Sequence, residues 1–123
     1  MPFAVAEQPE AGAIDLGIPG WSSTELFGNK SKENPTCCAI NTVEAGSSFT
    51  YTTNCTRYAI ILEGGAQIVD TVKPDEVKTI KAGDVVCVEG GSTLTWTTKT
   101  KMKSFYVVHK ELGNFEPSQG GLA

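Results

Sequence analysis

The stretches RYAIILEG, residues 57–64, and AGDVVCVEGGSTLTW, residues 82–96, decide the fold of this chain. Both are rich in β-branched and aromatic residues, which favour extended strands, and both run into glycines. The pairs Gly64-Gly65 and Gly90-Gly91 give the backbone freedom for tight turns, and no helical repeat follows either pair. The two stretches therefore predict short strands joined by tight turns.

The same pattern continues along most of the chain. Thr, Val, Ile, Tyr and Phe fill short runs that Gly, Pro, Asn or Asp separate, and no run keeps a helical period. The predicted strands are Cys37–Val43, Ser48–Thr53, Arg57–Val69, Val77–Ile80, Val85–Val88, Thr93–Thr98 and Lys103–Lys110. Many short strands at this close spacing predict an all-β sandwich, jelly roll or barrel.

Composition limits the classes of function. The chain has 123 residues, enough for one domain, and its 14 acidic against 10 basic side chains argue against a nucleic-acid partner. No apolar run approaches the roughly 20 residues that cross a bilayer, and the first residues lack the pattern of an export signal. We therefore expect a soluble, cytoplasmic protein with no membrane partner. The four cysteines are expected to be free thiols in that compartment.

The two ends differ from the middle of the chain. Residues 1–20 are rich in proline and glycine and predict an N-terminal arm, whose apolar segment Ala13–Ile18 could add an edge strand to its own or a neighbouring barrel. Residues 21–112 are predicted to form the barrel, and residues 113–123 a flexible polar tail. A small barrel with such an arm and open sheet edges gains from pairing, so we expect a homodimer.

Two motifs resemble those of the cupin family. Ala45-Gly46, Tyr51-Thr52-Thr53 and residues 57–64 together resemble the first cupin motif, in which two histidines and a glutamate precede a hydrophobic strand ending in Leu-Glu-Gly. Residues 82–94 resemble the second motif, with its Gly-Asp start and closing glycine. Among cupins, the Gly-Asp-Val and Ser-x-Leu-x-aromatic patterns and the final Phe-Tyr-Val strand resemble the small ethanolamine-utilisation-type, EutQ-like family. The resemblance covers about residues 37–110 and implies a cupin-type jelly-roll β-barrel.

The resemblance also places the family's metal-ligand positions on this chain. The histidines of the first motif fall on Tyr51 and Thr53, its glutamate falls on Arg57, and the histidine of the second motif falls on Leu94. First-row metals favour imidazole, thiolate and carboxylate ligands, and a guanidinium repels a cation. The sequence therefore predicts no metal and no other cofactor. Binding by cysteines stays an alternative that nothing in their spacing supports.

Strand alternation predicts the contents of the pocket, since residues two apart share a face. With the cupin motifs aligned, the predicted inward residues besides Tyr51 and Arg57 are Phe49, Thr53, Ala59, Ile61, Leu94 and Trp96, which are the predicted substrate-binding residues. They make an apolar and aromatic cup with one cation and a few hydroxyls. Such a cup suits a small organic ligand that bears a carboxylate, enolate or phenolate.

Three residues are candidates for catalysis. Arg57, the only arginine, can hold an anion or stabilise an enolate, or it can pair with a carboxylate of the chain itself. The acidic candidates for that pairing are Glu63, Asp84 and Glu89. Tyr51 can move a proton if a neighbouring cation lowers its pKa, or it can serve only in packing. His109, the only histidine, can act as a general base near pH 7, but alternation leaves open whether it faces the interior.

Three functions follow as hypotheses. The first is a metal-independent enzyme that uses acid–base chemistry on a small, anionic organic molecule, as a lyase or isomerase or in dehydration or cyclisation. The second is a non-catalytic binder or sensor of a small molecule with the same pocket. The third, implied by the resemblance alone, is an accessory protein of ethanolamine-utilisation type, for which the chain lacks a nucleotide-binding loop.

Overall fold

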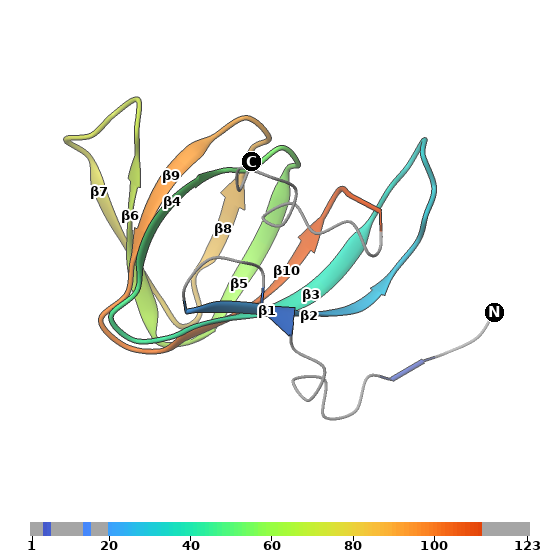
Figure 1. Ribbon diagram of the computed structural model, residues 1–123, viewed down its shortest axis with the longest axis horizontal. Coiled ribbons are helices and arrows are strands. Elements are labelled where there is room, and N and C mark those ends of the chain that lie inside the picture. The colour runs from blue at the N-terminus through green and yellow to red at the C-terminus, as the bar shows by residue number, and fades with distance from the viewer. Residues whose placement is uncertain (1–3, 6–13, 16–19, 112–123) are drawn as a thin grey trace.

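The computed structural model describes residues 4–5, 14–15 and 20–111, which form ten strands and no helix (Figure 1). The strands are β1 (Ile14–Asp15), β2 (Trp21–Gly28), β3 (Cys37–Val43), β4 (Ser48–Thr52), β5 (Arg57–Glu63), β6 (Gly65–Asp70), β7 (Val77–Lys81), β8 (Val85–Val88), β9 (Thr93–Thr97) and β10 (Met102–Val108). The part of the chain that the structure describes contains no helix capable of crossing a lipid bilayer.

The strands make two antiparallel sheets that face each other across the interior (Figure 1). One sheet has six strands in the order β1-β2-β3-β10-β5-β8, and the other has four in the order β4-β9-β6-β7. Several strands that are neighbours in the chain lie in different sheets, as β4 and β5 do, so the chain crosses repeatedly between the two layers. This is a jelly roll, and the predicted all-β architecture is confirmed.

Strict alternation builds the wall of the interior. In β3 and in β10 every second residue is buried, and β10 pairs with β3 on one side and with β5 on the other. An apolar cluster of Trp21, Val43, Tyr51, Ile61, Ala66 and Met102 then joins this wall to the four-stranded sheet. Burying each large side chain of such a cluster stabilises the fold by about 1.5–3 kcal/mol.

The predicted run Arg57–Val69 is two strands, β5 and β6, which belong to different sheets. They separate at Gly64, whose φ of 67° lies in the left-handed region that favours glycine. A side chain at this position would also collide with the backbone carbonyl oxygen of Lys101. The Leu-Glu-Gly end of the first motif therefore marks the corner at which the chain leaves one sheet for the other.

Strand β2 is absent from the sequence-based prediction. Its sequence, WSSTELFG, is rich in hydroxyl residues and lacks a simple alternation of apolar and polar residues. It pairs with β3 along most of its length, which buries Trp21 and places Ser23 in the interior. Tertiary pairing, which local propensity does not report, makes this segment a strand.

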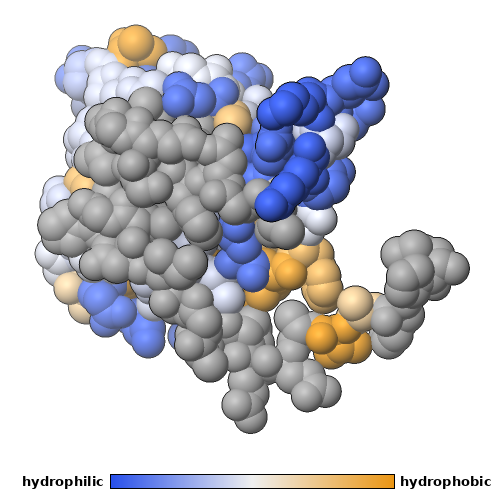
Figure 2. Space-filling view, turned by 45° about the vertical axis from the view of Figure 1, so that its right-hand side comes forward, coloured by the Kyte–Doolittle hydropathy of each residue, from blue (hydrophilic) through white to orange (hydrophobic). Residues whose placement is uncertain are grey.

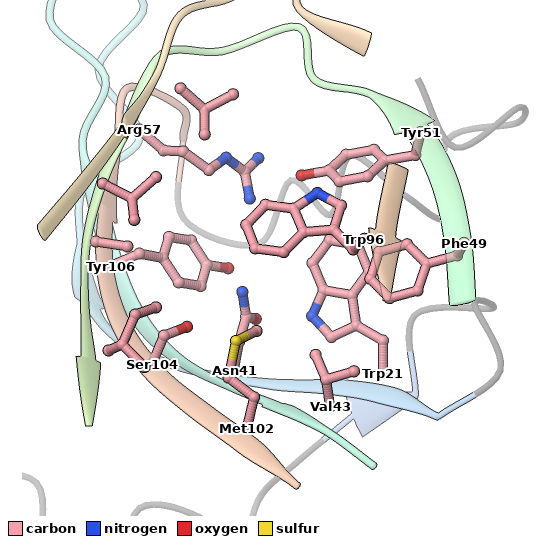
Figure 3. Close-up of a pocket in the computed structure, with 14 residues that line it drawn as sticks. Trp21, Asn41, Val43, Phe49, Tyr51, Arg57, Trp96, Met102, Ser104 and Tyr106 are labelled. Atoms are coloured by element: carbon pink, nitrogen blue, oxygen red, sulfur yellow. The ribbon is translucent and has the colours of Figure 1, made fainter. Parts of the chain in front are cut away.

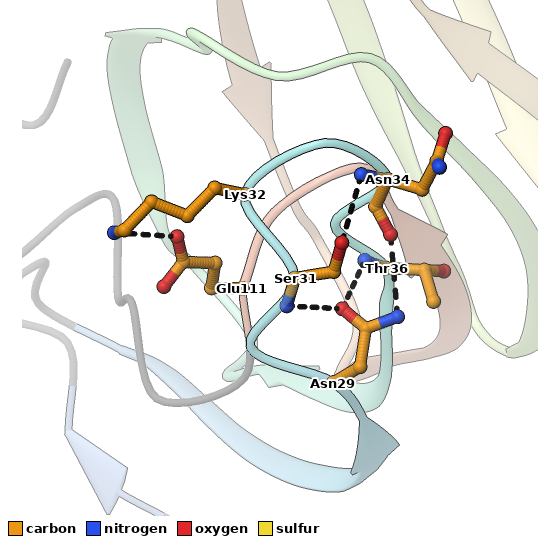
Figure 4. Close-up of polar contacts among 6 residues, drawn as sticks. All are labelled: Asn29, Ser31, Lys32, Asn34, Thr36 and Glu111. Carbon is orange, nitrogen blue, oxygen red and sulfur yellow. Dashed lines mark hydrogen bonds and ion pairs between the residues drawn. The ribbon is translucent and has the colours of Figure 1, made fainter.

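The connection between β2 and β3 is held by side chains of its own residues (Figure 4). Asn29 Oδ1 accepts hydrogen bonds from the backbone nitrogens of Ser31 at 3.1 Å and Thr36 at 3.3 Å, and Ser31 Oγ accepts one from the Asn34 nitrogen at 3.0 Å. Lys32 forms an ion pair with Glu111 at 3.2 Å, beyond the end of β10. In Figure 2 a strongly hydrophilic projection stands at the upper right, and the residues at the tip of this connection are polar and exposed.

Most of the two predicted end segments lies outside the described residues. Within the predicted arm, Ile14–Asp15 forms β1, which pairs with Ser22 and Ser23 of β2 at the edge of the six-stranded sheet. The rest of the arm before Gly20 and the predicted tail, 113–123, are not described, apart from residues 4–5. The predicted division into arm, barrel and tail therefore stays a prediction.

Candidate functional site

A cavity of about 40 Å³ lies between the two sheets (Figure 3). Its wall combines residues of β2, β4 and β9 with the inward faces of β3, β5, β8 and β10. The lining residues are Trp21, Asn41, Val43, Phe49, Tyr51, Arg57, Ala59, Ile61, Val86, Val88, Trp96, Met102, Ser104 and Tyr106. Nearly all are apolar or aromatic, and Arg57 is the only charged residue among them.

Aromatic rings make one side of the cavity. Trp21 stacks on Phe49 with ring centroids 5.2 Å apart, and its ring centroid lies 5.0 Å from that of Tyr51. Phe49 in turn stacks on Trp96 at 6.5 Å. Strand pairing explains the last contact, because Phe49 of β4 lies directly opposite Trp96 of β9. The rings form a rigid wall against which a flat ligand can pack.

Arg57, the first residue of β5, is buried at 8% exposure. Its Nη2 donates a hydrogen bond of 3.1 Å to Thr53 Oγ1, which itself donates to the Cys55 carbonyl at 2.9 Å. The guanidinium carbon lies 5.2 Å from the ring centroid of Tyr106 and 5.9 Å from that of Tyr51. These distances allow cation–π attraction from both rings. The cation is thus held in position at the cavity wall.

Tyr106, on β10, carries its hydroxyl into the interior. The hydroxyl lies 3.2 Å from Ser23 Oγ of β2, within hydrogen-bond distance. Burial raises the pKa of this phenol above its ordinary value, and the bond to Ser23 and the charge of Arg57 oppose the rise only in part. Tyr106 therefore stays protonated at neutral pH and keeps a hydrogen-bond donor beside the cavity.

The four positions that resemble metal-ligand positions meet at one place. Tyr51, Thr53, Arg57 and Leu94 all line a smaller cavity of about 10 Å³ that shares Tyr51, Arg57, Val88 and Trp96 with the larger one. Their groups are a phenol, a hydroxyl, a guanidinium and a hydrocarbon, and this set does not suit a first-row metal. Within residues 4–5, 14–15 and 20–111, no three His, Cys, Asp or Glu side chains gather as a metal site.

The structure brings most predicted site residues together and leaves one apart. Phe49, Ala59, Ile61 and Trp96 line the larger cavity with Tyr51 and Arg57, and Thr53 and Leu94 line the smaller one. His109 is exposed, and its ring lies edge-on to exposed Tyr58 at 5.8 Å. Because its neighbours Val108 and Lys110 are the buried residues there, alternation turns His109 to the outer face. Of the acidic candidates for pairing with Arg57, Glu63 lies 3.8 Å from Lys103, and Asp84 accepts the Lys81 backbone N–H.

Several lining residues are missing from the sequence-based prediction. Trp21 was missed together with strand β2, and Asn41, Ser104 and Tyr106 were missed although their strands were predicted. The alternation of inward and outward side chains along each strand could have identified two of them. Asn41 lies two residues before buried Val43, and Tyr106 lies two before buried Val108, so both share the inward face.

A groove of about 520 Å³ opens between the sheet edges formed by β7 and β8. It shares Val86 and Val88 with the larger cavity, and Val88, Ser92 and Leu94 with the smaller one. Lys73 and Lys78 lie on it together with Asp70, Glu76 and Glu89. The groove therefore borders the cavity at β8.

Two facing antiparallel sheets around a cavity at which both sequence motifs meet give this chain a cupin-type fold, and within that fold it is similar to the EutQ proteins. The EutQ protein of Clostridium difficile matches 85% of this chain and 81% of its own at a TM-score of 0.64 and 16% identity. Ectoine synthase from P. lautus matches 96% of this chain and 87% of its own at a TM-score of 0.74 and 17% identity.

A further similar structure is an RmlC-like cupin from Shewanella frigidimarina, which matches 92% of this chain and 94% of its own at a TM-score of 0.70 and 17% identity. No protein-family model and no curated protein matches the sequence. At these identities the likeness establishes the fold, and the chemistry has to be inferred from the residues of the cavity.

Proposed function

We propose that this chain is a metal-independent cupin that binds a small organic anion at Arg57 and acts on it by acid–base chemistry. The observation that supports it is the buried guanidinium of Arg57 in the wall of an otherwise apolar and aromatic cavity. In such low-dielectric surroundings a cation attracts an anion strongly. The planar donors of a guanidinium also match the two oxygens of a carboxylate.

The chemistry proposed is proton transfer beside a stabilised anion. Arg57 would stabilise negative charge on a carboxylate or enolate, and the hydroxyl of Tyr51 would deliver or accept the proton. Tyr106, which burial keeps protonated, would donate a hydrogen bond to the same ligand. Isomerisation, dehydration, elimination by a lyase and cyclisation all proceed through such steps. The likeness to ectoine synthase, an enzyme by name, supports a catalytic role for this fold.

A second candidate function is binding without turnover, as in a sensor. It is favoured by the lining of the cavity, because none of its fourteen described residues is a carboxylate or an imidazole. Proton transfer would then depend on phenols alone, whose ordinary pKa lies far above neutrality. The two functions share the anion site at Arg57 and differ in what Tyr51 does.

Proton exchange tests the proposal without knowledge of the natural substrate. Pyruvate in D₂O exchanges the protons beside its keto group, and NMR follows their loss. We expect the protein to accelerate this exchange and Tyr51→Phe to lower the acceleration about 100-fold or more. The matched control is Tyr58→Phe, which alters an exposed tyrosine outside the cavity and should leave the rate unchanged.

The outcomes separate the two candidates. Pyruvate binding that depends on Arg57, with no accelerated exchange, would favour the binder. Exchange that survives both Tyr51→Phe and Arg57→Ala would place the chemistry elsewhere and reject the proposal.

A further inference from the structure

Three buried polar atoms in the cavity wall have no hydrogen-bond partner within the described part of the chain. They are the indole nitrogens of Trp21 and Trp96 and the amide oxygen Oδ1 of Asn41. Trp21 is 5% and Asn41 9% exposed, so bulk solvent does not reach them. Buried polar groups in native proteins almost always have a partner, and leaving one without is costly. Three such atoms around one cavity are sites at which a bound molecule, either a ligand or water, can complete the hydrogen bonds.

The three atoms lie at two ends of the cavity (Figure 3). The indole nitrogen of Trp96 lies on the side of Arg57 and Tyr51, whereas the amide of Asn41 and the indole nitrogen of Trp21 point into the opposite end. Strand register supports the second grouping. Trp21 lies opposite Val43, two residues from Asn41, so Trp21 and Asn41 are diagonal neighbours on adjacent strands.

The first end suits a carboxylate. The indole nitrogen of Trp96 only donates and has no acceptor among the described residues, and the guanidinium of Arg57 on the same side carries a positive charge. A carboxylate has two oxygens and can accept from Arg57 and from Trp96 together. The donor at Trp96 therefore extends the anion site beyond the cation.

The second end suits a hydroxyl. It presents one donor, the Trp21 nitrogen, and one acceptor, Asn41 Oδ1, so its ligand has to accept and donate at once. An ammonium group cannot accept, and a carbonyl cannot donate, whereas one hydroxyl does both. A hydroxyl also serves either orientation of the Asn41 amide, whose oxygen and nitrogen are assigned from the hydrogen-bond pattern.

We propose that the ligand of this cavity is a short-chain hydroxycarboxylic acid. Its carboxylate binds Arg57 and the indole nitrogen of Trp96, and its hydroxyl binds the indole nitrogen of Trp21 and Asn41 Oδ1. The inference rests on the proposed function, because it uses the anion site at Arg57. The cavity volume of about 40 Å³ sets the length of the chain. One water molecule needs about 10–15 Å³ on the same measure, so only a few carbon atoms fit.

The test compares acids of matched size by NMR titration of the whole chain. Propionate is the reference, lactate and 3-hydroxypropionate add a hydroxyl at two positions, and alanine adds an ammonium group. We expect at least one hydroxy acid to bind about tenfold more tightly than propionate, since one well-placed hydrogen bond is worth about that factor. Alanine should bind no more tightly than propionate.

Two variants remove the hydroxyl site and keep the anion site. Asn41→Leu replaces the amide by an apolar group of similar shape, and Trp21→Phe keeps an aromatic ring without the N–H. In each variant that folds, the ratio of hydroxy acid affinity to propionate affinity should fall about tenfold, to near one. A hydroxy acid preference that survives in both variants would overturn the inference.

Failure of the inference and failure of the proposed function give different results. Equal binding of propionate and both hydroxy acids, lost in Arg57→Ala, would reject the hydroxyl site and leave the anion site standing. Binding of none of these acids by the wild-type chain would reject both proposals.

Discussion

Arg57 keeps its position through Thr53. Thr53 is 2% exposed, and its hydroxyl accepts from Arg57 Nη2 at 3.1 Å while it donates to the Cys55 carbonyl at 2.9 Å. Thr53→Val keeps the shape and removes both bonds. We expect a loss of about 1–3 kcal/mol in the free energy of unfolding and weaker binding of propionate. Thr53→Ser keeps the hydroxyl and is the control, and urea denaturation measures both. Equal stability of the two variants would show that Thr53 does not hold the guanidinium.

Cys37 gives the protein a dependence on alkaline pH. Its thiol is buried and donates to Glu25 Oε2 at 3.3 Å, and burial, the largest cause, raises its pKa from 9.0 to about 12. Between these two values the unfolded thiol ionises and the folded one does not. The contribution of this thiol to the free energy of unfolding is therefore fully present below about pH 9. It is lost as the pH rises toward 12, by up to about 1.4 kcal/mol per pH unit for one group.

Urea denaturation at pH 7, 9 and 10.5 measures this fall. The raised pKa of Tyr106 acts in the same direction, so the loss should persist in part when Cys37 is replaced. We expect Cys37→Ala to flatten the decline above pH 9 relative to the wild type. A wild-type stability that stays constant to pH 10.5 would contradict the account of this thiol.

At the scale of elements, the corner between β5 and β6 depends on Gly64. Gly64→Ala adds a methyl group that meets the Lys101 carbonyl oxygen, in addition to the strain of a φ of 67°. Gly46 is a matched control, because its φ is 77° and a methyl group there meets nothing within 4 Å. We expect Gly46→Ala to cost about 1–2 kcal/mol, and Gly64→Ala to cost clearly more, in chemical denaturation. Similar losses of stability in the two variants would mean that backbone strain, and not the collision with Lys101, accounts for the whole effect.

Much of the element order could be predicted from the sequence. Strands Cys37–Val43 and Val85–Val88 have the predicted bounds, because both contain β-branched residues and turn residues follow them. Strand β2 could not be predicted, because its serines and threonine show no alternation and it is extended through pairing with β1 and β3. Gly64 indicates that the run Arg57–Val69 is interrupted. That β5 and β6 belong to different sheets depends on the topology of the whole barrel, which the local sequence does not report.

Only part of the candidate site could be predicted from the sequence. The two motifs led to Arg57, Tyr51 and Trp96, which the structure places at one cavity. Asn41 and Tyr106 have inward parity, yet nothing in the sequence says that β10 lies between β3 and β5, so their contribution needed the sheet order. The unmatched hydrogen-bonding groups of the tryptophans could not be predicted at all, since they depend on ring orientation.

For the whole molecule, the expected homodimer remains a prediction. Tyr58, Ile60 and Leu62 of β5 are 48%, 38% and 44% exposed, which leaves apolar side chains on the outer face of the six-stranded sheet. We expect light scattering at micromolar concentration to give the mass of two chains and Leu62→Glu to lower it. Val72→Glu, at a residue 79% exposed between β6 and β7, is the control. A monomeric wild-type protein would contradict the expectation.

The proposed function of the whole molecule depends on one property, that the barrel presents Arg57 to a bound anion. The most direct measurement is an NMR titration of wild type and Arg57→Ala with propionate, lactate and 3-hydroxypropionate. We predict saturable shifts in residues that line the cavity, Phe49, Ala59 and Ile61 among them, and their loss in a folded Arg57→Ala variant. Equal binding by the wild type and Arg57→Ala, or shifts confined to the outer face, would contradict it.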